Sequence, residues 1–320
     1  MGSSKSFYTR IERFFFAEDN RTEFIVFFRV TVGLVTLMHF LSTIADFDRL
    51  FSSKSIIPQD IMNAFTPDWI ITFPRIVHFF ETLGISESST IVIVQSLFIS
   101  CCVFIITGFF SRISAFVLLF LQISLIKGSS FFIYGVDFFT SMSLFYIILF
   151  PSDNFFSLRN YITKRKVRTV NFMPVKRMFQ LHISIAYFFS GFGKLLGFNW
   201  RNGEAIWKAI NLPYANRDFY FDFSWLAAHS FILIFIGWFT FIIEMCYPLF
   251  IWIVPTRKIW LFFTIMMHLG IALTLNLYYF SAIMIVWNIA NFYFEPGQAF
   301  DLVKICRRKI ARKKSSIQTA

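Results

Sequence analysis

Long runs of apolar residues alternate along this chain with short segments that carry most of the charges. A helix needs about 20 consecutive apolar residues to cross the hydrocarbon core of a bilayer, and most of the runs approach that length. The pattern therefore predicts transmembrane helices at residues 24–44, 90–110, 113–126, 132–150, 178–196, 230–253, 259–275 and 279–294. The third and the eighth runs are the shortest.

The segment between the first two runs has a different pattern. Residues 65–84, FTPDWIITFPRIVHFFETLG, mix aromatic residues with charges and prolines. Such a mixture favours a helix that lies in the membrane interface over one that crosses the bilayer. The other connections are short, and no internal repeat of fixed period is visible, so we expect the runs to form one domain.

The composition agrees with this interpretation. Hydrophobic residues make up 57% of the 320 residues and charged residues only 15%, which leaves too little polar surface to cover a soluble globular protein. We expect an all-α fold, a polytopic integral membrane bundle of about eight transmembrane helices. Its parts are a cytoplasmic N-terminal segment (1–23), a transmembrane domain (24–296) and a basic cytoplasmic tail (297–320).

The formal net charge of +12 gathers on one side of the predicted bundle. Basic residues concentrate before the first run, at Arg112, in the connection 151–177, at 255–258 and in the tail. With eight spans all five segments fall on the same side, which the positive-inside rule identifies as the cytoplasm. Both termini are then cytoplasmic. Topology and anionic lipid account for the charge without a nucleic-acid partner.

Several ionisable residues lie inside the predicted spans, where such residues are costly and by default mark a functional site. The topology places Lys194 in the last turns of the fifth span, near the outer face, and His268 closer to the middle of the membrane. The same outer level holds Tyr134, Asp137, His39 and Asn276. No Cys or His spacing suits a zinc site, so we expect no metal.

Each of these residues also has a structural interpretation. Lys194 can extend its long side chain to the outer interface, or it can pair with Asp137. His182 and His268 are equally compatible with hydrogen-bonded packing histidines. If apolar surroundings dominate around Lys194, burial disfavours its charged form, and the neutral amine can act as a general base. A nearby carboxylate opposes that effect.

Other charged and aromatic residues have simpler expected roles. Arg29, near the cytoplasmic edge of the first span, is expected to anchor that span to lipid head groups. Glu244 precedes Pro248, and we expect its side chain to bond backbone groups that the proline leaves unpaired. Trp200 and Trp207 fit an aromatic belt at the outer interface.

The fifth span reads A-Y-F-F-S-G-F-G-K-L at 186–195 and is followed by F-N-W-R-N-G at 198–203. Supporting pieces occur in order at Phe28-Arg29 with Gly33, Ile133-Tyr134-Gly135, Phe150-Pro151, and His268 followed by Tyr279-Phe280-Ser281. Together they resemble the membrane region of vitamin K-dependent gamma-carboxylase. Bacterial proteins share that region as the horizontally transferred transmembrane (HTTM) domain. The resemblance covers most of residues 24–294.

The resemblance implies a function for the outer cluster. Lys194 takes the place of the base that deprotonates the reduced quinone (vitamin K-like) cofactor, and oxygenation then gives an epoxide. His268 matches a histidine of the later helices. The catalytic candidates are therefore Lys194, His268 and Asp137. The substrate-binding candidates are Tyr134, His39, Trp200 and Asn276.

The sequence departs from the carboxylase at three points. Gly193-Lys194 replaces a paired lysine, Ser129-Ser130-Phe131-Phe132 holds no histidine where the carboxylase has one, and no counterpart of the large lumenal domain is present. These differences argue against glutamate carboxylation. A bare membrane domain resembles the short bacterial members, among them SdpB-like proteins needed to mature secreted toxin peptides. That likeness implies the inner (cytoplasmic) membrane of a bacterium.

Two main hypotheses follow. The chain is either a quinol-oxidising or peptide-modifying membrane enzyme with Lys194 as general base, or a non-catalytic partner for maturation or export of a secreted peptide. The second hypothesis adds a peptide or another membrane protein to the lipid bilayer as a partner. Transport is a third hypothesis, but no predicted span carries the Gly and Pro interruptions typical of broken transporter helices.

Overall fold

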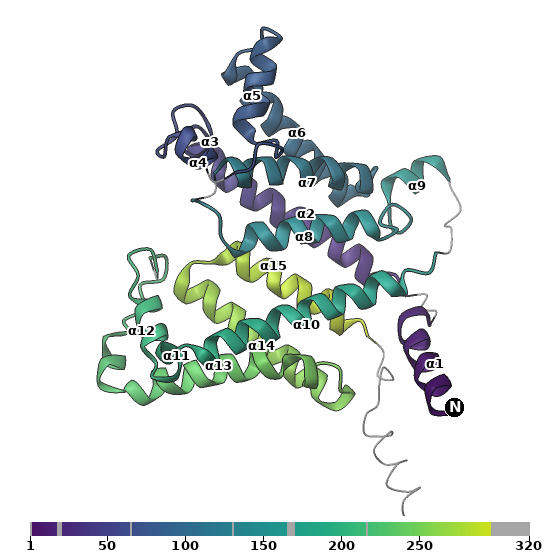
Figure 1. The fold of residues 1–320 in the computed structure, drawn as a ribbon, viewed down its shortest axis with the longest axis vertical. Helices are drawn as coiled ribbons and strands as arrows, with labels where there is room; N and C mark the ends of the chain where they lie inside the picture. The colour runs from purple at the N-terminus through teal and green to yellow at the C-terminus, as the bar shows by residue number, and fades with distance from the viewer. Residues whose placement is uncertain are drawn as a thin grey trace, which may run out of the picture. The chain divides into compact units, whose positions relative to one another are not determined.

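All regular elements of the computed structural model are helices (Figure 1), and it describes residues 2–17, 21–64, 66–129, 131–164, 170–215 and 217–295. No strand occurs in these ranges, so the predicted all-α class is confirmed there. The helices are α1 (Gly2–Phe16), α2 (Glu23–Thr43), α3 (Phe47–Phe51), α4 (Gln59–Asn63), α5 (Phe73–Thr82), α6 (Glu87–Thr107), α7 (Ser111–Gly128), α8 (Gly135–Leu149), α9 (Leu158–Thr163), α10 (Met173–Leu196), α11 (Phe198–Arg201), α12 (Glu204–Ile210), α13 (Ser230–Phe250), α14 (Val254–Leu275) and α15 (Tyr278–Asn288).

Five of these helices are long and apolar enough to cross a membrane, namely α2 with its continuation to Phe51, α6, α7, α13 and α14. The chain is therefore a helical membrane protein. Helix α8 is apolar but shorter. Helix α10 has 24 residues, but Gln180, His182 and Lys194 make it less apolar. Helix α15 has 11 residues and continues as a π-helical turn over Ile289–Tyr293. The count of eight spans and their orientation stay predictions.

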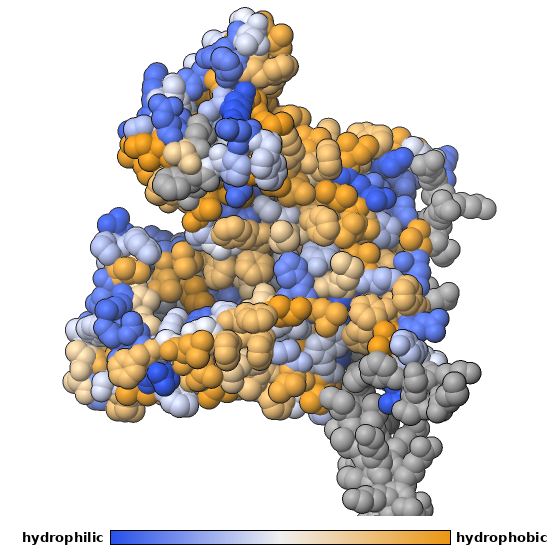
Figure 2. All heavy atoms as spheres, viewed as in Figure 1, coloured by the Kyte–Doolittle hydropathy of each residue, from blue (hydrophilic) through white to orange (hydrophobic). Residues whose placement is uncertain are grey.

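The long helices expose large apolar side chains, as a lipid-facing surface requires. Phe231 and Phe235 of α13 and Phe262 of α14 are each more than half exposed. Only 17% of the most apolar part of α14 is buried inside the protein. Figure 2 shows apolar side chains over α6 and α7, whereas hydrophilic side chains gather around α3 to α5 and near α9. This distribution fits helices whose ends meet water and whose middles meet lipid.

The chain divides into two compact units. The first unit comprises residues 1–177 and 282–286, and the second comprises 178–281 and 287–320. The predicted basic tail, 297–320, lies outside the described residues. The prediction of one transmembrane domain over 24–296 stays a prediction.

In the first unit, helices α2, α6, α7 and α8 pack on one another (Figure 1). Phenylalanines fill the space between them: the rings of Phe40 and Phe98 stack with their centroids 3.8 Å apart. The rings of Phe24 and Phe150 make a T-shaped contact with their centroids 5.4 Å apart. Helix α5 packs on α6 and α7; it lies in the segment for which the sequence predicts an interfacial helix.

Arg29 of α2 is a structural residue of this unit. Its side chain is 1% exposed and donates hydrogen bonds to the carbonyl oxygens of Ser152, at 3.1 Å, and Phe156, at 2.7 Å. The expectation that Arg29 anchors the first span to head groups is therefore wrong. A Cβ at Gly108, where φ is +76°, would clash with the Arg29 guanidinium, so only glycine can end α6 beside this arginine.

In the second unit, α13 packs on α14, and the short helices α11 and α12 pack on α13. Two glycines permit these contacts. A Cβ at Gly237 of α13 would clash with the Trp200 carbonyl oxygen, and a Cβ at Gly203, where φ is +81°, would lie 2.8 Å from the backbone nitrogen of Ile234. The F-N-W-R-N-G sequence that follows α10 is thereby held tightly against α13.

Candidate functional site

Lys194 of α10 forms an ion pair with Glu244 of α13. Its Nζ atom lies 2.5 Å from Glu244 Oε2, and it also donates a hydrogen bond of 2.6 Å to Ser190 Oγ. The Lys194 side chain is 19% exposed and that of Glu244 only 8%. A buried charge is tolerable when a partner of opposite charge satisfies it. Lys194 is therefore a paired residue and not one that merely reaches the interface.

The pairing corrects the role expected for Glu244. Its carboxylate binds Lys194 rather than backbone groups near Pro248. Sequence reasoning missed it as a site residue because depth along a span says nothing about which way a side chain points. One signal was present: Glu244 is an acidic residue within an otherwise apolar run, and such a residue requires a cationic partner.

Gly191 brings the two paired helices together. It lies one turn before Lys194 on the same face of α10. A Cβ at this position would lie 2.8 Å from the Phe241 carbonyl oxygen and would clash with the Met245 nitrogen. The backbones of α10 and α13 approach at this point as closely as glycine allows, which is typical of helix contacts in membranes. Glu244 lies in the stretch of α13 that Gly191 contacts.

The Trp200 ring lies close to the Lys194 ammonium group. Lys194 Nζ lies 5.2 Å from the centre of the Trp200 ring, within the range of a cation–π interaction. Trp238 donates from Nε1 to the Arg201 carbonyl oxygen at 3.1 Å, which fixes α11 on α13. Because of the cation–π contact, Trp200 touches the candidate base directly.

In α12, which follows α11, Lys208 lowers the pKa of the exposed Glu204 through a side-chain hydrogen bond.

His268 of α14 lies in a chain of buried hydrogen bonds. His268 Nε2 and the Tyr187 hydroxyl are 2.7 Å apart, and Asn288 Nδ2 donates to the same hydroxyl at 2.7 Å. The Tyr247 hydroxyl donates to Asn288 Oδ1 at 2.7 Å. Since Tyr187 accepts from Asn288, its own hydrogen is available to His268 Nε2. The proton of a neutral His268 ring is then on Nδ1.

That Nδ1 atom is buried and has no hydrogen-bond partner among the described residues. The charge of Lys194 acts on His268, and that of Glu244 acts on Tyr187, so the ion pair and the hydrogen-bond chain are neighbours.

Sequence reasoning found His268 but missed the three residues Tyr187, Tyr247 and Asn288. The spacing of seven residues between Tyr187 and Lys194 was the available signal, because it places both on one helix face.

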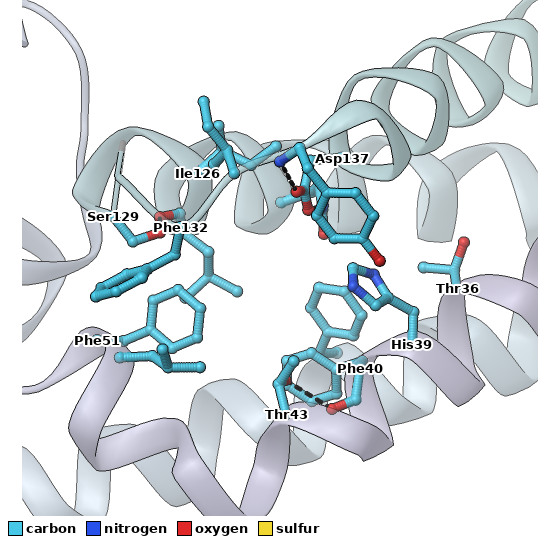
Figure 3. A pocket seen from close by; sticks show the side chains of 15 residues that line it. Thr36, His39, Phe40, Thr43, Phe51, Ile126, Ser129, Phe132 and Asp137 are labelled. Carbon is cyan, nitrogen blue, oxygen red and sulfur yellow. Dashed lines mark hydrogen bonds between the residues drawn. The ribbon is translucent and has the colours of Figure 1, made fainter. Parts of the chain in front are cut away.

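The other candidates form a cavity in the first unit. His39, Tyr134 and Asp137 line a cavity of about 320 Å³ (Figure 3). Asp137 Oδ1 accepts a hydrogen bond from Gln122 Nε2 at 3.2 Å, and Oδ2 accepts one from the Tyr134 backbone N–H at 3.0 Å. The remaining lining residues are aromatic, aliphatic and polar in similar number, and the aromatic ones are Phe40, Phe51, Phe98 and Phe132.

The candidate site residues proposed from the sequence are thus distributed over both units. The first holds His39, Tyr134 and Asp137, and the second holds Lys194, His268, Trp200 and Asn276. Asn276 ends α14 with φ +54°, donates to the Tyr214 carbonyl oxygen at 3.1 Å and accepts from the Tyr278 hydroxyl at 3.3 Å. These contacts fix the turn between α14 and α15. The rings of His182 and Trp287 make a T-shaped contact with their centroids 5.3 Å apart.

The chemistry available in the second unit is proton transfer. The side chains bring together an amine, a carboxylate, an imidazole and two phenols. In the described part of the chain no group of three or more His, Cys, Asp or Glu side chains could hold a metal ion. Comparisons with protein families, curated proteins and solved structures found no match to this chain.

Proposed function

We propose that this chain is an HTTM-like membrane enzyme that takes a proton from a lipophilic hydroquinone, with Lys194 and Glu244 as the proton-accepting pair. The observation that carries the proposal is the ion pair between them, with Nζ and Oε2 2.5 Å apart. The Lys194 side chain is only 19% exposed and that of Glu244 only 8%. The resemblance to the carboxylase region assigns the base to Lys194, and the pair supplies a second proton acceptor beside it.

The pair can accept a proton in either of two forms. In the ion-paired form, the Glu244 carboxylate takes the substrate proton, and the Lys194 ammonium remains to neutralise the oxygen anion left behind. In the form that has already lost a proton, the Lys194 amine is the acceptor. Both forms end with one more proton on the pair and a cation beside the new anion, which low-dielectric surroundings make strongly favourable.

The hydrogen-bond chain has a positioning role in this proposal. It ties His268 of α14 to Tyr187 of α10, and Asn288 connects them to Tyr247 of α13. These hydrogen bonds thereby link α10, which carries Lys194, and α13, which carries Glu244, to α14. The unpartnered Nδ1 of His268 is the donor we assign to a substrate oxygen.

A reduced quinone, when bound, would supply an acidic hydroxyl group and the reducing electrons, and the residues of the second unit would accept the proton. The cavity in the first unit is a separate candidate site for a small molecule. Its volume of about 320 Å³ is near the lower end for such sites, and His39, Tyr134 and Asp137 are its polar ligands in this proposal.

The proposal includes an eight-span topology with both termini in the cytoplasm. The test is a pair of reporter fusions, one after Lys164 in the connection α8–α10 and one after Leu212 in the connection α12–α13. A reporter active only in the cytoplasm should work at Lys164 and fail at Leu212. The reverse pattern, or activity at both sites, would contradict the orientation.

The function is tested with the purified full-length protein, the hydroquinone of menaquinone-4 and oxygen, with the epoxide measured by liquid chromatography and mass spectrometry. Lys194→Ala should lower epoxide formation by about 100-fold or more, because it removes the amine base of one form and the neutralising cation of the other. Lys194→Arg keeps the cation, so a comparable loss in this variant identifies the amine as the acceptor. Near-normal activity of Lys194→Arg together with a comparable loss in Glu244→Gln identifies the carboxylate as the acceptor. Lys208→Arg and Glu204→Gln are matched controls, since these residues form an exposed ion pair at 2.6 Å. Equal loss in controls and site variants, or no epoxide from the wild type, would overturn the proposal.

A second candidate is a non-catalytic partner in the maturation or export of a secreted peptide. The connection between α12 and α13, predicted to lie outside, exposes the aromatic side chains of Tyr214, Phe219, Tyr220 and Phe221. Such rings are suited to holding a peptide. A peptide that co-purifies with the wild type and is lost on Tyr220→Ser and Phe221→Ser substitution, without any bound quinone, would favour this function.

A further inference from the structure

A second cavity, of about 570 Å³, lies in the first unit at the ends of apolar helices. We call it the arginine cavity, after Arg112 and Arg159, which line it. Arg112 is in the first turn of α7, and Leu149 at the rim is the last residue of α8. Figure 1 shows these helix ends next to α9, and Figure 2 shows hydrophilic side chains gathered there. The sequence predicts that this end faces the cytoplasm.

Both arginines are held in place by the protein. Arg112 Nε donates to the Ile148 carbonyl oxygen at 2.7 Å. Its two Nη groups donate no hydrogen bond to any residue within the described ranges. The Arg159 guanidinium lies 4.8 Å from the centre of the Phe110 ring, and its Nη1 is 3.9 Å from Asp153 Oδ2. Fixed guanidinium groups with unused N–H donors are suited to binding phosphate oxygens.

The local charge favours an anion. Asp153 is the carboxylate in the lining of the cavity, and its charge also acts on the buried Arg29. Asp153 therefore interacts with two guanidinium groups, those of Arg29 and Arg159, and Arg112 adds a further positive charge to the lining. The positive charge that remains faces the cavity through Arg112 and Arg159.

The wall of the cavity changes from polar to apolar. Leu149 and Val170, 37% and 46% exposed, line it together with Val175 in the first turn of α10. A soluble phosphate would gain nothing from these exposed apolar side chains, whereas the acyl chains of a lipid would pack against them. We propose that the arginine cavity binds the phosphate group of an anionic phospholipid, with Arg112 and Arg159 as its ligands. This proposal is independent of the proposed enzyme function.

The test is native mass spectrometry of the full-length protein in mild detergent, titrated with dioleoyl phosphatidylglycerol. The Arg112→Gln/Arg159→Gln variant should bind this lipid about 30-fold more weakly, as expected for the loss of two cationic contacts near the membrane surface. The control, Arg10→Gln/Arg13→Gln, removes the same charge from exposed positions of α1 outside the cavity and should change binding by about threefold or less. Equal losses in both variants would show a bulk charge effect and overturn the site.

Two further measurements decide between sources of the phosphate and exclude misfolding. Dioleoyl phosphatidylcholine should bind more weakly than phosphatidylglycerol to the wild type, and glycerol phosphate should not displace bound lipid. Displacement by glycerol phosphate would overturn the lipid assignment in favour of a soluble ligand. Arg112→Lys/Arg159→Lys keeps the charge without the planar fork, so its affinity should lie between those of the wild type and the Gln variant. Wild-type affinity in the Gln variant would refute the proposal outright.

Discussion

Alanine at Gly191 and alanine at Gly193 should have opposite effects on stability. The two positions lie two residues apart in α10, so the substitution and its effect on helix propensity are the same. A Cβ at Gly191 would lie 2.8 Å from the Phe241 carbonyl oxygen and would clash with the Met245 nitrogen, whereas a Cβ at Gly193 has nothing within 4 Å. The difference between the variants isolates the contact between α10 and α13.

The magnitude follows from two opposing terms. Replacing glycine by alanine inside a helix stabilises it by up to about 1 kcal/mol, and Gly193→Ala should show this gain. Overpacking at a close contact costs about 1–3 kcal/mol, and the clashing atoms at Gly191 are backbone atoms that cannot rotate away. Gly191→Ala should therefore be less stable than Gly193→Ala by about 1–3 kcal/mol.

The assay is reversible unfolding of the purified protein in detergent, followed by tryptophan fluorescence, with thermal midpoints as a second readout. Gly191→Ala should also weaken the Lys194–Glu244 pair, because the helices that carry it must move apart. Its effect should therefore shrink in a Lys194→Ala background. Equal stability of Gly191→Ala and Gly193→Ala would refute the close approach of α10 and α13 on which the candidate site depends.

Three other substitutions test the structure. Lys194→Ala and Glu244→Ala should each destabilise by about 3 kcal/mol, the cost of a buried charge without its partner, and the double variant by less than the sum; additive losses in unfolding experiments would contradict the ion pair. Arg29→Gln should destabilise by about 2–4 kcal/mol because two buried carbonyl oxygens lose a charged donor, while the exposed Arg49→Gln should stay within about 0.5 kcal/mol. Tyr187→Phe should cost about 1–3 kcal/mol by removing the buried hydroxyl that bonds both His268 Nε2 and Asn288 Nδ2, and an unchanged midpoint would argue against the hydrogen-bond chain.

The sequence was sufficient to locate the helices because bilayer thickness sets the length of an apolar run. The predicted spans at 24–44 and 90–110 correspond to α2 and α6 within a few residues. The prolines and charges of residues 65–84 distinguished this segment, which contains the amphipathic helix α5, from the predicted spans. Element type and position follow from local composition, which the sequence contains in full.

The contacts of the site depend on distant parts of the chain, and hydropathy does not encode them. The position of Lys194 within the fifth apolar run was enough to predict it as a site residue. Its pairing with Glu244 could not be predicted, because it depends on how α10 and α13 cross at Gly191. Arg29 was misjudged for the same reason. Its position near a span end suggested head groups, whereas its partners are carbonyl oxygens more than 120 residues away.

The central claim is that Lys194 serves proton transfer with a hydroquinone, and mass spectrometry of small molecules and peptides that co-purify in mild detergent tests it most directly. The account predicts a quinone on the wild type and on Lys208→Ala, and a depleted quinone on Lys194→Ala at equal yield of folded protein. A co-purified peptide without any quinone on the wild type, or a quinone retained equally by Lys194→Ala, would contradict it.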